Sequence, residues 1–148
     1  MNIMNLRTKR LRVVLAGLLI ASAAATTTSV MARDAVLEQL PKTSYPATQN
    51  ADLKAAREAI VRAASGLGWE LREESVNQLK LHYNKQGKHM VNIAVDYDAT
   101  GYTIRYLNSI NLNHSVGNDG ALRIHPNYNR WVRNLIKHIN IQPIGSAQ

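Results

Sequence analysis

Histidine is the residue type in this sequence best suited to metal binding or proton transfer at neutral pH. The chain holds five of them, His82, His89, His114, His125 and His138. None belongs to an HExxH motif or to an i, i+4 pair, the spacing that places two imidazoles on one metal. His114 and His125 flank a loop that holds Asp119, which is the one place where a metal could be enclosed. Because no spacing completes a ligand set, we predict no metal site.

Nucleophilic and acid–base catalysis also lack a motif. The chain has no Cys, no GxSxG turn and no SxxK motif. Ser109 and Ser115 lie near His114 in the sequence, but such proximity does not make a catalytic dyad. The carboxylate pairs Glu73–Glu74 and Asp96–Asp98 are typical of solvated strands and turns. We therefore predict no catalytic residue and no cofactor.

Amide and imidazole side chains are concentrated in the segment 108–128. One interpretation is a recognition loop for a glycan, a peptide or a partner protein, positioned by neighbouring strands and a helix. The other is that the Asn side chains cap backbone groups in an irregular loop, with Tyr128 in the core. The candidate binding residues are Asn111, Asn113, His114, His125 and Tyr128.

Length and charge narrow the classes further. The 148 residues suit one small domain, and the lack of Cys excludes disulfides and thiolate metal sites. The net charge of +8 falls to +4 when residues 1–32 are left out. That excess is ordinary for a soluble domain. We expect no nucleic acid partner, and a polyanionic surface remains an alternative partner.

The N-terminus has the three parts of a secretory signal peptide. Residues 1–12 are basic, residues 13–25 are apolar, and small residues lead to Ala32. We predict cleavage between Ala32 and Arg33, with an earlier site after Ala25 as the alternative. The apolar run is short for a membrane span, which needs about 20 residues. The prediction is a periplasmic or secreted protein that meets the membrane only transiently, through this peptide.

Hydrophobic periodicity predicts the elements of the remaining chain. Residues 33–49 read as an extended lead-in, in which Asp34–Leu40 could form one helical turn that Pro41 would stop. A spacing of three and four predicts a helix over 51–67, capped by Asn50 or Asp52. A second helix follows Pro126, with an apolar stripe at Tyr128, Trp131, Val132, Leu135 and Ile139.

Between the helices, alternating residues predict half-buried antiparallel strands over 79–84, 91–98 and 102–106, with a further short strand near 69–74. A three-residue loop 85–87 would pair Asn84 with Lys88 and give Gly87 a positive φ. A four-residue turn 98–101 would give Gly101 a positive φ and place Val95 opposite Ile104.

The predicted fold class is α+β. Two layers are expected, an antiparallel sheet of three or four strands with two helices packed on one face, in the order α-β-β-β-α. The predicted organisation is a signal peptide over 1–32, the lead-in over 33–49, one domain over 50–142 and a tail over 143–148.

A set of motifs in this chain is similar to a family. They are Gly68-Trp69, Val91-x-Ile93-x-Val95-x-Tyr97, Tyr102-x-Ile104-x-Tyr106, Ser109-x-Asn111-Leu112 and Ile124-His125-x-x-Tyr128-Asn129-x-Trp131. Over about residues 50–140 the chain resembles a group of small exported proteins of Gram-negative bacteria, a domain of unknown function with some lipoprotein members. The resemblance implies an envelope location and a helix–sheet–helix domain. It transfers no catalytic residues, and this chain lacks a lipid-attachment Cys.

These observations favour a non-enzymatic binding or accessory module of the cell envelope, whose partner is an unidentified envelope protein or a polyanionic surface. The alternative is a small periplasmic enzyme, or a small-ligand or glycan binder, that uses the 108–128 loop. The outermost strand, near 102–107 or 69–74, could pair with another chain. The sequence does not define the oligomeric state.

Overall fold

The computed structural model describes residues 34–46 and 52–144, which belong to one compact unit. The predicted signal peptide and its cleavage site lie outside the described residues. The elements are β1 (Ala35–Val36), β2 (Thr43–Ser44), α1 (Leu53–Gly66), β3 (Trp69–Ser75), β4 (Gln78–Lys85), β5 (His89–Tyr97), β6 (Gly101–Ile110), β7 (Ser115–Val116), β8 (Leu122–Ile124) and α2 (Asn127–Asn140).

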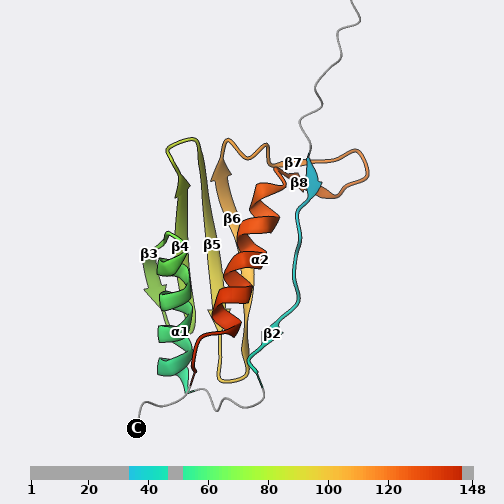
Figure 1. Ribbon diagram of the computed structural model, residues 1–148. Helices are drawn as coiled ribbons and strands as arrows, with labels where there is room; N and C mark the ends of the chain where they lie inside the picture. Colours follow the sequence, from blue (N-terminus) through green and yellow to red (C-terminus); the bar gives the residue numbers. More distant parts are fainter. Residues whose placement is uncertain (1–33, 47–51, 145–148) are drawn as a thin grey trace, which may run out of the picture. The chain divides into compact units, whose positions relative to one another are not determined.

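The architecture is α+β, as predicted. The main sheet has five antiparallel strands in the order β2-β6-β5-β4-β3, and a small sheet has the order β1-β8-β7. Both helices cover the same face of the main sheet (Figure 1). We expected three or four strands in the order α-β-β-β-α. The structure adds β1, β2, β7 and β8, which have only two or three residues each. Such strands are too short to produce a detectable periodic pattern.

Helix α1 forms where the sequence predicts a helix, and Asp52 is its N-cap. The Asp52 carboxylate accepts a hydrogen bond from the Ala55 N–H (2.6 Å), which satisfies a free donor of the first turn. The buried stripe includes Ala56, Ile60 and Ala63, whereas Leu53 is exposed. The helix ends at Leu67, and Gly68 follows with a φ of +82°.

Helix α2 buries the predicted apolar stripe in full, and Asn129 is buried beside it. This asparagine is 5% exposed, and its side chain is the only buried polar one among the described residues. The two helices are 14 residues each, and no helix in the described ranges is both long and apolar enough to cross a membrane.

The hairpin between β4 and β5 corrects the predicted register. Asn84 pairs with Met90, not with Lys88, and Leu81 pairs with Ile93. The shift is two residues, so every side chain stays on its predicted face. The turn occupies residues 86–88. Gly87 has the expected positive φ (+72°), and the φ of Gln86 is also positive (+54°). His82 consequently lies opposite Asn92, and His89 opposite Lys85.

The next hairpin places Val95 opposite Ile104, as predicted. The expected positive φ of Gly101 is wrong, because Gly101 is already the first residue of β6. The reason for a glycine at this position is steric. A Cβ at this position would stand 2.2 Å from the Thr43 carbonyl oxygen. Gly101 therefore lets β2 approach β6.

The N-terminal segment packs onto the domain. The helical turn expected over 34–40 is wrong, because residues 35–36 form a strand that pairs with β8. Leu37 and Tyr45 are both more than nine-tenths buried and belong to the same core as the helices. The gain from burying these two side chains outweighs the weak helical pattern.

Substituting Gly101 tests the approach of β2. We expect Gly101→Ala to lower the free energy of unfolding, because the new Cβ collides with backbone that cannot move without breaking the β2–β6 pairs. The matched control is Gly66→Ala in the last turn of α1, where a Cβ meets nothing within 4 Å. That variant should gain up to about 1 kcal/mol from helix propensity. Urea unfolding of both variants measures the difference, and equal effects would contradict it.

Candidate functional site

Residues 37–42, here called the strap, connect β1 to β2 and run beside β6 (Figure 1). One end is fixed by the Leu37 N–H, which donates to the Leu122 carbonyl oxygen (2.8 Å). The other end continues into the pairing of Thr43 with Tyr102. Between these ends, no hydrogen bond in the described ranges involves the backbone of Gln39, Leu40 or Lys42. The backbone of the strap is thus hydrogen-bonded at its ends and not in its middle, where the side chain of Leu40 packs against the core.

Helix α2 holds the first part of the strap through two side chains. The Asn129 carboxamide donates to the Val36 carbonyl oxygen (2.8 Å) and accepts from the Glu38 N–H (3.2 Å). One turn later, the Arg133 guanidinium forms a two-pronged ion pair with the Glu38 carboxylate. The hydrogen bonds from Arg133 hold the pKa of Glu38 below its usual value.

Strand β6 presents backbone groups to the strap that are not paired with another strand. The Asp98 N–H donates to the Gly101 carbonyl oxygen (2.9 Å), so Gly101 faces β5. Antiparallel residues alternate between the two neighbouring strands, and therefore Thr103 and Arg105 also face β5. Ile104 and Tyr106 point their N–H and C=O groups away from β5, and β2 does not extend to them.

Pro41 explains why the pairing of β2 ends where it does. The register that joins Thr43 to Tyr102 would place Pro41 opposite Ile104 and Gln39 opposite Tyr106. Proline has no N–H to donate, so it ends a ladder of this kind. The strap departs from β6 at this residue, and its backbone is hydrogen-bonded to the protein again at Glu38 and Leu37.

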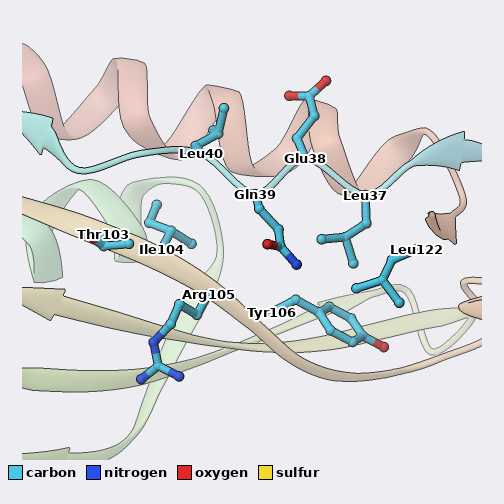
Figure 2. Close-up of a pocket in the computed structure, with 9 residues that line it drawn as sticks. All are labelled: Leu37, Glu38, Gln39, Leu40, Thr103, Ile104, Arg105, Tyr106 and Leu122. Atoms are coloured by element: carbon cyan, nitrogen blue, oxygen red, sulfur yellow. The ribbon is translucent and has the colours of Figure 1, made fainter. Parts of the chain in front are cut away.

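The result is a slot between the strap and β6, with a volume of about 370 Å³. Figure 2 shows the side chain of Gln39 pointing from the strap into this space, toward β6. The slot is lined by apolar and polar side chains from three parts of the chain: Leu37, Glu38, Gln39, Leu40, Thr103, Ile104, Arg105, Tyr106 and Leu122. Its volume lies at the lower end of the range of ligand pockets, about 300–1,000 Å³.

The opposite edge of the sheet differs from β6. Strand β3 has Glu70, Arg72, Glu73 and Glu74 in its seven residues, and its pairing with β4 is interrupted by a bulge. Charged side chains and bulges are the usual means of preventing an edge strand from pairing with another chain. Strand β6 also carries a charge, at Arg105, and its pairing with β5 shifts register after Tyr106, but Ile104 and Tyr106 have no strand partner on the outer side and lie under the strap.

The predicted binding residues Asn111, Asn113 and His114 lie beyond the end of β6. Asn111 accepts a hydrogen bond from the His89 ring at its carbonyl oxygen (2.7 Å) and donates from its side chain to the Lys88 carbonyl oxygen (2.9 Å). Both asparagines have positive φ angles, of 60° and 50°. His114 stacks on Tyr106 at a centroid distance of 4.6 Å. Asn111 and His114 are therefore in contact with the domain, and Asn113 adopts a backbone conformation that asparagine tolerates better than most residues.

His125 and Tyr128 lie at the start of α2. The His125 Nδ1 atom accepts a hydrogen bond from the Asn127 N–H (3.2 Å), and the ring lies 5.6 Å from that of His89. Tyr128 is 1% exposed and meets Tyr106 edge to face. Burial raises the pKa of Tyr128 above its ordinary value, so its hydroxyl cannot serve as a base at neutral pH. The structure brings His114 and Tyr128 together through Tyr106, and His125 instead joins His89.

A second cavity of about 410 Å³ lies at the other end of β6 and contains the carboxylates of Asp96 and Asp98. Hydrogen bonds from Arg105, together with Gln78, lower the pKa of Asp96. Lys42 and Thr100 lower the pKa of Asp98. Both groups therefore stay ionised and already accept hydrogen bonds, which leaves neither available as a general acid at neutral pH.

Neither metal-binding side chains in the described ranges nor related proteins identify a function for this chain. In the described ranges, no three His, Asp or Glu side chains lie close enough to hold a metal ion. No known protein family matches the chain, and neither a curated protein nor a solved structure is significantly similar to it.

The slot escaped prediction because its parts are far apart in the sequence. The strap ends at residue 42 and β6 begins at residue 101, and residues 33–49 read only as a lead-in. One signal was present. Pro41 directly follows Leu40, and the largely apolar Tyr45 comes four residues later. This pattern is typical of an extended segment that packs on an edge strand.

Asn129 provides a test of the strap's anchoring. We expect Asn129→Ala to lower the free energy of unfolding by about 2 kcal/mol, because the Val36 carbonyl and the Glu38 N–H lose their partner. Asn134→Ala, on the exposed face of the same helix, should change it by less than about 0.5 kcal/mol. Urea denaturation measures both variants. A loss for Asn134 equal to that for Asn129 would argue against the anchoring role.

The Glu38–Arg133 pair makes stability depend on pH. The pKa of Glu38 is lower in the folded state than its ordinary value of 4.5. Its contribution to stability is therefore complete above that value and is lost as the pH falls through the folded pKa. We expect Arg133→Gln to destabilise the protein at pH 7 and to approach the stability of the parent protein as the pH falls through the folded pKa of Glu38. A destabilisation independent of pH, measured by urea unfolding, would contradict this role.

Proposed function

We propose that this protein is a non-enzymatic binding module exported to the cell envelope, which binds an extended segment of a partner protein along the open edge of β6. The export rests on the signal-like N-terminus, whose basic and apolar parts precede the domain. The binding mode is β-strand addition, in which main-chain hydrogen bonds supply affinity and flanking pockets supply specificity.

The observation that carries the proposal is that Ile104 and Tyr106, whose backbone groups point away from β5 and are not paired with β2, line the slot. Buried or half-buried backbone donors without partners are costly, so a site that leaves them open favours a chain that can pair with them. The slot admits about three residues of strand, or about 10 Å.

Among the residues that the structure describes, the groups considered for catalysis already have partners, which favours the binding proposal over the enzymatic alternative. The carboxylates in the second cavity are held ionised by Arg105 and Lys42. The loop residues proposed for a glycan or small-ligand site are engaged with the domain itself. Binding at the strap does not use the 108–128 loop except where Leu122 closes one end of the slot.

The test is selection of ligands from a displayed library of eight-residue peptides, followed by mapping on the full chain by NMR. We expect selected peptides to shift the amide signals of Ile104 and Tyr106 more than those of Glu70 and Arg72 on the β3 edge. Gln39→Trp should abolish binding, because Gln39 is exposed and points into the slot. Asn134→Trp is the matched control and should bind normally.

Two results would contradict the proposal. Peptides that bind but shift only the amide signals of the 108–128 loop would show that this loop is the binding site. Peptides that bind equally to the Gln39→Trp variant would exclude the slot as the binding site.

A further inference from the structure

We infer that the slot selects segments with an apolar–polar–apolar triplet, and that the Gln39 carboxamide binds the main chain of the middle residue. This inference rests on the proposed function and specifies the chemistry of its ligand. It also gives Gln39 the role of a positioning residue, one that orients the bound segment.

The alternation follows from the faces of β6. Residues directly opposite each other in an antiparallel pair point their side chains to the same face of the sheet. Ile104 and Tyr106 point to the helix-covered face, where Leu37 and Leu122 also line the slot. Side chains of a bound segment opposite Ile104 and Tyr106 would therefore enter apolar surroundings. A charged group there would be buried without a partner, which is unfavourable.

The middle residue of the triplet faces the other way. It would lie opposite Arg105, whose side chain is 52% exposed on the outer face of the sheet. A polar side chain at that position stays in water beside the guanidinium. Pairing with Ile104 and Tyr106 uses the backbone groups of the two apolar residues, so the N–H and C=O of the middle residue point toward the strap.

Gln39 is placed to meet those groups. Its side chain extends from the strap into the slot (Figure 2), and none of the described residues forms a hydrogen bond with its carboxamide. A carboxamide has two N–H donors and an oxygen acceptor, so it can pair with the N–H and C=O of one extended residue at once.

The same chemistry already operates in this protein. The Asn129 carboxamide donates to the Val36 carbonyl oxygen and accepts from the Glu38 N–H, which places an amide side chain along the edge of an extended segment. Gln39 would use the same two amide groups on the bound segment, with the N–H and C=O of one residue in place of the groups of two. Because the backbone of Gln39 and Leu40 forms no hydrogen bond with the described residues, this part of the strap can adjust to the segment.

The experiment measures peptide affinity for the full chain by isothermal titration calorimetry. The probes are eight-residue peptides whose central triplet is Val–Ser–Val, the inverted Ser–Val–Ser, or Val–Ser–Val with an N-methyl group on the middle residue. We expect Val–Ser–Val to bind at least tenfold more tightly than Ser–Val–Ser. Gln39→Ala should weaken Val–Ser–Val about tenfold, the loss expected for one or two hydrogen bonds. Asn134→Ala is the matched control and should have no effect.

The N-methylated peptide separates a direct contact from a structural effect. It removes the donor that faces Gln39, so it should lose affinity for the parent protein but no further affinity for Gln39→Ala. Additive losses would overturn the role of Gln39, as would unchanged affinity in the Gln39→Ala variant. Equal binding of Val–Ser–Val and Ser–Val–Ser would overturn the triplet preference. In each of these cases, shifts at the Ile104 and Tyr106 amides would leave the proposed function intact, and only their absence would remove both.

Discussion

The pairing between β2 and β6 stops at Pro41 because proline has no N–H with which to continue the ladder. The candidate site depends on this one missing donor. The strap has to leave β6 there, yet the hydrogen bond from Leu37 to Leu122 and the Asn129 carboxamide bring it back at its other end. The strap and β6 therefore enclose an opening between these two attachment points. Ile104 and Tyr106 line it on the β6 side.

The rest of the domain supports that geometry. Gly101 allows β2 to approach β6, and the Tyr106 ring is fixed by His114, Tyr128 and Ser109. Several side chains of the 108–128 segment therefore stabilise the end of β6, whatever else that segment binds. The β3 edge carries charges and a bulge, whereas in β6 the end of the β2 pairing leaves Ile104 and Tyr106 without a strand partner on the outer side.

Sequence patterns predicted the α+β class, both helices and the faces of the central strands, because these depend on local periodicity and on capping residues such as Asp52. The β4–β5 register was off by two residues, since two pairings separated by that distance bury the same side chains. The role of Gly101 and the burial of Leu37 and Tyr45 depend on contacts between distant segments. The strap and its slot belong to that second kind, so periodicity could not reveal them.

The central claim is that the β6 edge is open at Ile104 and Tyr106, and hydrogen exchange of individual backbone amides in the free protein tests it most directly. Thr103 and Arg105 face β5, and we predict slow exchange for both. Ile104 and Tyr106 should exchange much faster, despite lying between them in the same strand. Equally slow exchange of all four amides would show that the edge is already paired, and would contradict the account.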